Sequence, residues 1–423
     1  MALTPPITYE IVEPMSTEEC NNFNRRYLLQ CMGLVTAGLA LRPRSSFASE
    51  TETLGFSNGT RELVVYPQKR PMLRVTARPP HLETLFSVFN ESVLTPNDAF
   101  FVRYHLANVP TSIDPDTYQL RIKGLVDKPL TLSLRALKAL GRSVERVAVN
   151  QCSGNSRGYG SPRVFGAQLG NGSMGNARWT GIPLKTVLQH AGVQSGAQQV
   201  TFRGLDHPVL PSTPQFIKSL SIDLALSDEP MIAWAMNGTD IPLLNGYPIK
   251  LIVPGYAGTY WVKHLSEVNV IDHRFDGFFM AKAYRVPDND CQCVAPGTVA
   301  EATRPIGKLK VRSFITSLRP GDHVKAGQTI TLKGIAFDGG SGIQWVEVSD
   351  NGGKKWQRAM LGEDLGSYSF RAWSLTWRPP HKGKVGLQVR ACSNLGEQQP
   401  LNASWNPSIY LKNNIETTPI DVV

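Results

Sequence analysis

The order of apolar and polar residues predicts a domain of mixed strands and helices in the first part of the chain. Between residues 97 and 270, runs such as Gln199–Phe202 and Ile249–Val253 have the composition of buried strands. They alternate with a helix-like segment, Leu184–Ala191, which ends at Gly192. This mixture predicts a mixed α/β domain.

The pattern changes after Pro305, where short alternating strands take over. Examples are Gln328–Leu332, Ile343–Val348 and Gly386–Arg390, and Gly-Gly, Asn-Gly and Pro-Pro turns separate them. This spacing predicts an immunoglobulin-like β-sandwich. Residues Arg285–Arg304, rich in Pro, Asp and Cys, are expected to connect the two domains, which gives an α+β protein overall.

The amino terminus resembles a twin-arginine export signal. Paired arginines in Asn24–Leu29 stand directly before the apolar run Tyr27–Leu41, and Ser46–Ala48 has the small residues of a cleavage site. The apolar run is too short to span a bilayer, which needs about 20 residues. We therefore expect a periplasmic protein without a membrane span; a basic leader with a surface helix is the alternative. The predicted segments are a signal peptide (1–48), an amino-terminal extension (49–96), the α/β domain (97–284), a connection (285–304) and the sandwich (305–423).

Composition and charge narrow the classes of partner. Hydrophobic residues make up 41% of the chain and charged residues 18%, which is typical of a globular protein with ample core. The net charge is +10, and the predicted leader has equal numbers of acidic and basic residues. The charge therefore belongs to the mature protein and favours an anionic ligand, although a solvated basic surface would give the same sum. Nucleic acid is a poor candidate because the cations are dispersed and no recognition motif accompanies them.

Few cysteines follow the predicted leader, so a disulfide scaffold is excluded. They are Cys152, Cys291, Cys293 and Cys392. Because one residue separates Cys291 from Cys293, we expect them to be loop thiols and not a mutual disulfide. The sequence contains no Cys-x-x-Cys-His motif, so we expect no c-type haem on this chain.

Cys152 stands where a strand-like run gives way to a turn. The run Val147–Val149 is followed by Ser153–Ser156, which has turn chemistry, and then by Arg157. Loops at strand ends often carry active sites, and a thiolate is a soft metal ligand. A buried cysteine that acts as a small apolar residue is the alternative.

These residues resemble the hallmark of the sulfite oxidase family of molybdenum enzymes, in which a cysteine is followed by Gly-Asn and a substrate-side arginine. The resemblance extends along most of the chain, through Thr95–His105, Ala177–Leu184, Gly204–Asp206, Met236–Gly238, Gly246–Gly255 and Val346–Gly353. Within the family, Gly170–Gly181 is most similar to the molybdenum subunit of sulfane dehydrogenases of bacterial thiosulfate oxidation.

The resemblance implies a molybdenum–molybdopterin cofactor with Cys152 as the protein's metal ligand. It implies cofactor contacts from Phe101, Val102, Arg103, His105, Cys152, Asp206, Asn245, Lys250, Trp261, Val262 and Lys263. Asn245 and Lys250 stand where animal sulfite oxidases have His and Arg, and we expect Lys250 and Lys263 to bind the pterin phosphate. The substrate side is expected to consist of Arg103, Arg157 and Tyr284, because arginines match a sulfur oxyanion and a tyrosine hydroxyl can stabilise developing charge. Each of these residues has an alternative role. Arg103 and His105 could form the polar face of a strand, and Asp206 could cap a turn. Arg157 could be a salt-bridge partner and Tyr284 a surface tyrosine.

One departure from the family concerns the substrate. Sulfite-oxidising relatives have a further arginine in a Trp-Asn-x-Arg context, whereas Trp405–Ser408 has serine at that place, and Gly170–Met174 lacks an enclosing tryptophan. The sequence therefore favours oxidation of sulfane sulfur on a carrier protein, with a c-type cytochrome as electron acceptor and the sandwich as the homodimer contact within a hetero-oligomer. The alternatives are a free-sulfite dehydrogenase, a sulfoxide reductase and a metal-free binding module.

Overall fold

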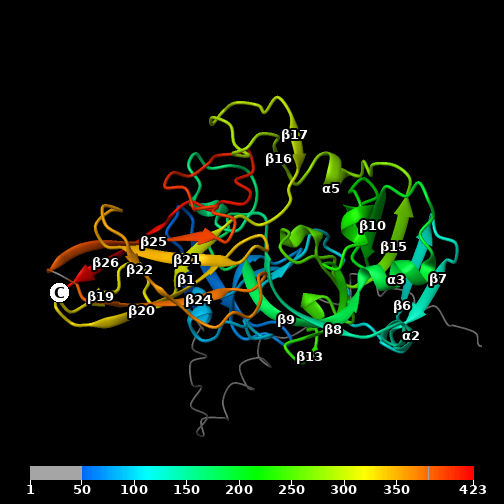
Figure 1. The fold of residues 1–423 in the computed structure, drawn as a ribbon, viewed down its shortest axis with the longest axis horizontal. Helices are drawn as coiled ribbons and strands as arrows, with labels where there is room; N and C mark the ends of the chain where they lie inside the picture. Colours follow the sequence, from blue (N-terminus) through cyan, green and yellow to red (C-terminus); the bar gives the residue numbers. More distant parts are fainter. Residues whose placement is uncertain (1–49, 380) are drawn as a thin grey trace, which may run out of the picture. The chain divides into compact units, whose positions relative to one another are not determined.

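Three β-sheets form the part of the protein that surrounds Cys152. A computed structural model describes residues 50–379 and 381–423, so the predicted signal peptide lies outside the described residues (Figure 1). The first sheet contains β1 (Thr51–Thr53), β2 (Thr60–Val64), β3 (Met72–Thr76), β4 (His81–Glu83) and β5 (Val102–Arg103), in that order. It spans residue 97, where the sequence analysis places a domain boundary.

The second and third sheets carry the predicted α/β domain. The second has the order β11 (Ile217–Ser221), β10 (Gln199–Gly204), β15 (Leu265–Ile271), β6 (Gln119–Gly124) and β7 (Leu130–Ser133), with β15 and β6 parallel. The third has the order β13 (Thr239–Asp240), β12 (Met231–Met236), β9 (Met174–Pro183) and β8 (Val144–Gln151), and β14 (Lys250–Ile252) pairs with β12. The strands predicted at Gln199–Phe202 and Ile249–Val253 are thus confirmed.

The helices are short, and periodicity explains the longest one. Helix α3 (Leu184–Ala191) buries Leu184, Val187, Leu188 and Ala191, which lie on one face at helical spacing. It ends at Gly192, whose φ of 70° is in the left-handed region that glycine adopts without strain. Within residues 50–379 and 381–423 the other α-helices are α2 (Leu134–Ala139), α4 (Ile222–Ala225) and α5 (Phe278–Ala281).

The carboxy-terminal part is a β-sandwich, as predicted. One sheet has the order β18 (Arg312–Ile315), β20 (Ile330–Phe337), β24 (Arg371–Trp377) and β23 (Met360–Leu361). The other has the order β19 (His323–Val324), β26 (Thr417–Val422), β25 (Gly383–Ser393), β21 (Ile343–Ser349) and β22 (Gln357–Arg358). Leu332, Val346 and Leu387 are fully buried in a core between the two sheets. Apolar residues alternate with polar ones along the strands, and the apolar ones face this core.

The connection between the domains corrects one prediction. Its ends pair as β16 (Arg285–Pro287) and β17 (Thr303–Pro305), and the loop between them contains a Cys291–Cys293 disulfide. The prediction of two free thiols is wrong because Gln292 adopts a φ of 54°, which turns the chain so that the two cysteine Cα atoms lie 5.1 Å apart. That separation is within the ordinary range for a disulfide.

None of the helices within residues 50–379 and 381–423 is long and apolar enough to cross a membrane.

Candidate active site

Backbone and side-chain hydrogen bonds fix the turn that presents Cys152 at the end of β8. The Cys152 amide donates to the Ser173 carbonyl over 2.9 Å, and the Asn155 amide donates back to the Cys152 carbonyl over 3.0 Å. The Asn155 side-chain oxygen accepts from the Ser173 amide over 3.0 Å. Because β8 and β9 pair in continuous register up to Gln151, the strand holds the turn in place. Cys152 is a half-buried free thiol.

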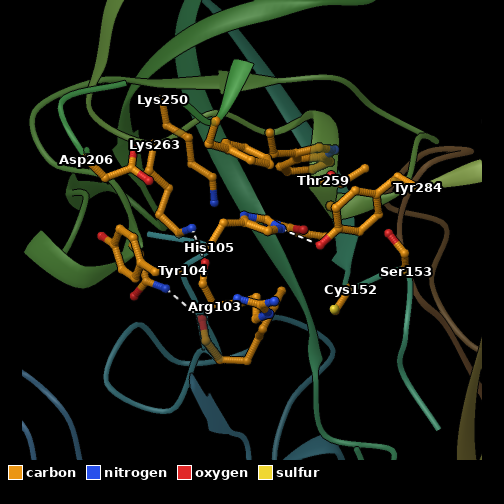
Figure 2. Close-up of a pocket in the computed structure, with 16 residues that line it drawn as sticks. Arg103, Tyr104, His105, Cys152, Ser153, Asp206, Lys250, Thr259, Lys263 and Tyr284 are labelled. Atoms are coloured by element: carbon orange, nitrogen blue, oxygen red, sulfur yellow. Dashed lines mark hydrogen bonds between the residues drawn. The ribbon is translucent and has the colours of Figure 1, made fainter. Parts of the chain in front are cut away.

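The thiol lies at the wall of a cavity that brings most of the predicted cofactor residues together (Figure 2). From that set the lining contains Phe101, Arg103, His105, Cys152, Asp206, Asn245, Lys250, Trp261 and Lys263, and it also contains Tyr284. Val102 and Val262 do not line it, because both side chains are buried in apolar clusters.

Two buried lysines line the cavity, and their charge depends on what binds there. Lys250 is 1% exposed, and its ammonium lies 4.8 Å from the Trp179 ring centroid and 5.6 Å from that of Trp261. Burial lowers the pKa of Lys250 well below its usual range, and neighbouring cations lower it further. Lys263 donates to the Arg103 carbonyl, and burial lowers its pKa to about 8 while the Asp206 carboxylate opposes that shift. An anion bound here would restore the charged form of both lysines.

His105 and Tyr284 form a hydrogen-bonded pair on the cavity wall. The Tyr284 hydroxyl contacts His105 Nε2, and the imidazole stacks on Phe216 with 3.9 Å between ring centroids. Burial, reinforced by Arg103, lowers the pKa of His105, and burial raises the pKa of Tyr284. At neutral pH the histidine is therefore uncharged and the tyrosine protonated, so Tyr284 presents a hydroxyl proton to a ligand or to the histidine.

Arg157 lies beside the cavity and is not part of its lining. Its Nε donates to the Ser408 carbonyl over 2.8 Å and its Nη1 to the Ala167 carbonyl over 3.3 Å. Its guanidinium also lies 5.2 Å from the ring centroid of Tyr410. A Cβ atom at Gly154 would lie 2.7 Å from Arg157 Nη2, so glycine at that position makes room for the guanidinium.

The structure adds residues that sequence reasoning missed. Tyr104, Asn150, Ser153, Phe216, Gly258 and Thr259 also line the cavity. Tyr410 stacks on Tyr284 with ring centroids 5.4 Å apart and an interplanar angle of 17°. The positions of Asn150 and Ser153 beside Cys152 could have signalled them, whereas Phe216 carried no signal because it lies far from Cys152 in the sequence, directly before the edge strand β11.

The cavity fits an anionic, hydrogen-bonding cofactor. Asn150 Oδ1, Ser153 Oγ and Thr259 Oγ1 are buried and have no hydrogen-bond partner among the described residues. Buried polar atoms without partners are costly, so such a group of atoms indicates a ligand that satisfies them. Together with Lys250, Lys263 and the thiol, they match a phosphate-bearing pterin and a soft-ligand metal.

Comparison with known proteins agrees with this fit. The oxidoreductase molybdopterin binding domain family matches residues 105–279, and the Mo-co oxidoreductase dimerisation domain family matches residues 303–416. This fold and site define a molybdopterin-dependent oxidoreductase of the sulfite oxidase type.

The chain belongs to the sulfite oxidase family. It is 35% identical to sulfite oxidase of Gallus gallus, over 80% of this chain and 76% of that protein. It is 34% identical to mitochondrial sulfite oxidase of Homo sapiens, over 82% of this chain and 65% of that protein. The sulfane dehydrogenase SoxCD from Paracoccus pantotrophus has the same fold, with a TM-score of 0.70, 22% identity and coverage of 91% of this chain and 95% of that one.

Anion binding by cofactor-free protein should weaken as the pH rises through the pKa of Lys263. A lysine with a pKa of about 8 is charged below that pH and loses its charge above it. One unit above its pKa about one-tenth of the side chain stays charged, so sulfate, whose own charge is constant over this range, should bind about tenfold more weakly at pH 9 than at pH 7. Calorimetric titration with sulfate measures this. Lys263→Met protein should bind weakly at both pH values, and equal wild-type affinities would contradict the assignment.

Proposed function

We propose that this enzyme oxidises a small sulfur oxyanion of the sulfite type and passes the electrons singly to an external acceptor. The observation that carries the proposal is the free Cys152 thiol at the wall of a cation-lined cavity with unsatisfied polar atoms. When bound, the molybdenum cofactor supplies oxygen-atom transfer and takes up two electrons. Water supplies the oxygen atom that is added to sulfur, and its two protons pass to solvent. The protein's own residues would hold that cofactor and attract the anion.

The roles follow from the positions of the side chains. Cys152 would hold the metal as a thiolate, and Lys250 and Lys263 would bind the anionic part of the pterin. Arg103, on the cavity wall, would attract the substrate oxyanion with a permanent charge, and Arg157 would add to this attraction from beside the cavity. The Tyr284 hydroxyl would donate a hydrogen bond to an oxygen on which charge develops.

The enclosure of the site supports a small substrate. Arg157 is 9% exposed, and the stacked rings of Tyr284 and Tyr410 lie next to it. A bulky protein arm would have to displace these side chains, whereas a small oxyanion would not. The identity of 35% to a sulfite oxidase supports the same choice, although the sequence analysis favoured a carrier-bound substrate.

Sulfane sulfur on a carrier protein is the second candidate. The observation that favours it is Ser408, which stands where sulfite-oxidising relatives have an arginine. Its backbone carbonyl also accepts a hydrogen bond from Arg157 Nε. The substrate side therefore has fewer free cations than a strong dianion site would have. A substrate of lower charge would lose less from this arrangement.

The acceptor and the location are further parts of the proposal. With no haem attachment motif in the chain, we propose a c-type cytochrome as acceptor, and we propose a homodimer formed through the domain that resembles dimerisation domains. The arginine pair in Asn24–Leu29 supports export to the periplasm.

Replacing the paired arginines should block this export. A protein with Arg25→Lys and Arg26→Lys should accumulate in the cytoplasm, as cell fractionation would measure, and unchanged export would contradict the proposal.

Cys152→Ser should abolish turnover while the protein remains folded. A hydroxyl is a harder and less readily ionised ligand than a thiol, so the metal would lose its fitted donor. Molybdenum analysis, circular dichroism and activity per chain measure this. Cys392→Ser, which changes a buried free cysteine in the sandwich, is the matched control and should retain activity. Wild-type protein without molybdenum, or an active Cys152→Ser enzyme, would refute the proposal.

Ser408→Arg should lower the KM for sulfite by about tenfold. A further charge-assisted contact to a dianion is worth about 1.5–3 kcal/mol, which corresponds to one to two orders of magnitude in affinity. Steady-state assays with cytochrome c as acceptor measure this, and Ser408→Gln controls for side-chain length without charge. The same assays should give faster wild-type turnover with sulfite than with carrier-bound sulfane sulfur. The opposite order would favour the second candidate.

A further inference from the structure

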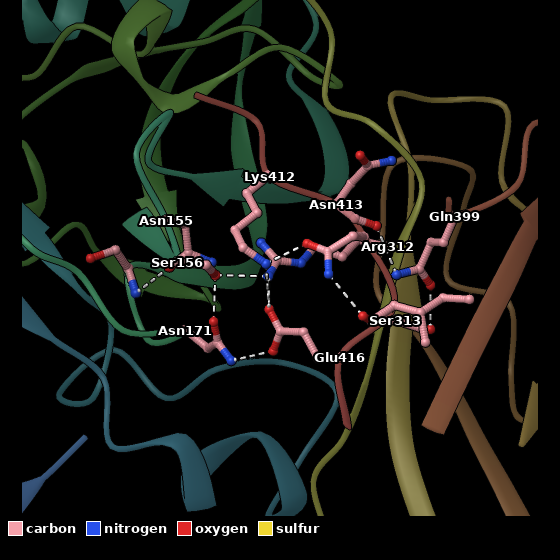
Figure 3. A network of polar contacts seen from close by, with 12 residues as sticks. Asn155, Ser156, Asn171, Arg312, Ser313, Gln399, Lys412, Asn413 and Glu416 are labelled. Carbon is pink, nitrogen blue, oxygen red and sulfur yellow. Dashed lines mark hydrogen bonds and ion pairs between the residues drawn. The ribbon is translucent and has the colours of Figure 1, made fainter. Parts of the chain in front are cut away.

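A buried arginine of the sandwich contacts the turn that carries Cys152. Arg312 is the first residue of β18, and it is 1% exposed. Its Nη2 donates to Ser156 Oγ over 2.7 Å and to Glu416 Oε1 over 2.7 Å (Figure 3). One guanidinium nitrogen thus joins the active-site turn, the sandwich and the carboxy-terminal segment.

The contacts of this arginine are part of a closed ring of four side chains. Asn171 Nδ2 donates to Glu416 Oε2 over 2.9 Å, and the Ser156 hydroxyl donates to Asn171 Oδ1. Arg312, Glu416, Asn171 and Ser156 therefore each hold two others of the ring. Lys412 lies 3.7 Å from the same glutamate and adds a second positive charge to the cluster.

The ring holds a residue with an unfavourable backbone conformation. Ser156 has a φ of 70°, in the left-handed region that residues other than glycine rarely adopt. It precedes Arg157, so a change in its backbone would move both Arg157 and the turn that begins at Cys152. Its amide also donates to the Gly170 carbonyl over 2.7 Å, which fixes the backbone at a second point.

The carboxy-terminal segment contacts the same turn at two further points. The Leu411 amide donates to the Ser153 carbonyl over 2.9 Å, and the Ser408 carbonyl accepts from Arg157. Glu416 anchors this segment to Arg312 a few residues further on. The turn between Cys152 and Arg157 is therefore held by groups that lie far away in the sequence.

Stability alone does not explain why an arginine occupies this position. Arg312 Nε and Nη1 have no hydrogen-bond partner among the described residues, so part of its polar surface is buried at a cost. Apolar residues of similar volume often replace buried ion pairs without loss of stability. A role that needs directed hydrogen bonds to Ser156 and Glu416 accounts for the guanidinium better.

We infer that Arg312 is a positioning residue that keeps Arg157 and Cys152 in their substrate-binding arrangement by fixing Ser156. The sandwich would then contribute to substrate affinity in addition to any pairing of two chains. This inference rests on the proposed function only for the identity of the substrate. The mechanical link from Arg312 to the turn does not depend on it.

The test compares Arg312→Met with Arg312→Lys in purified holoenzyme. The methionine variant should raise the KM for sulfite at least about tenfold, with kcat per molybdenum changed less than threefold, because small misplacements of binding groups are costly. The lysine variant should recover part of the loss, since an ammonium can still donate to Ser156 and Glu416. Hydrogen–deuterium exchange of the peptide that covers residues 152–160 should be faster in the methionine variant, and this readout is independent of activity.

Arg390→Met is the matched control. Arg390 also belongs to the sandwich, donates to a glutamate, Glu347, over 2.8 Å and lies over an aromatic ring, that of Trp356. Its replacement should leave both the KM and the exchange of residues 152–160 unchanged. If Arg312→Met behaves like this control, or if it only lowers molybdenum content, the inference fails. If wild-type enzyme does not oxidise sulfite but exchange still accelerates in Arg312→Met, the proposed substrate fails and the positioning role stands.

Discussion

The burial of positive charge beside a thiol is the constraint on which the active site depends. Lys250 and Lys263 lie within an apolar shell that contains Trp179, Trp261 and Tyr104, and Asp206 is the carboxylate among the cavity's lining residues. Cations in such surroundings lose hydration and favour the neutral form unless an anion accompanies them. An anionic pterin bound by these lysines would resolve this conflict, and the cavity's unsatisfied oxygens would gain partners at the same time.

Asn245 illustrates how the protein supports this cavity from outside. The Asn245 side chain donates to the Phe101 carbonyl over 2.9 Å, and its oxygen accepts from the buried ammonium of Lys69. Lys69 also donates to the carbonyls of Asn97 and Phe100, over 2.7 Å and 2.9 Å. The loop between β2 and β3, which carries Lys69, thereby orients the Asn245 amide on the cavity wall. Animal sulfite oxidases have a histidine at the position of Asn245.

On the substrate side, the charged groups are arginines, and one of them already donates hydrogen bonds to protein carbonyls. Arg157 is held by backbone carbonyls and an aromatic ring, and such contacts fix a guanidinium while they use part of its hydrogen-bonding capacity. Arg103 keeps its side chain at the cavity wall. A site with one half-buried arginine on the cavity wall and one arginine engaged by carbonyls is suited to selecting an anion by position as well as by charge.

The sequence alone determined the features that depend on neighbours along the chain. The helix at Leu184–Ala191, its end at Gly192 and the strand before Cys152 follow from periodicity, glycine conformation and β-branched composition, which are local properties. The resemblance to the family along the chain, and not the Cys152 motif alone, predicted most of the residues that line the cavity.

Only the tertiary structure decided which distant segments meet. Arg157 contacts Ser408, and Asn171 contacts Glu416, across 251 and 245 residues of sequence, and no local pattern encodes such pairs. The Cys291–Cys293 bond was also missed, because it needs a left-handed residue that spacing does not reveal. Backbone periodicity is imposed by short-range sterics and hydrogen bonding, whereas these contacts arise when complementary side chains from remote segments are packed into the same buried space.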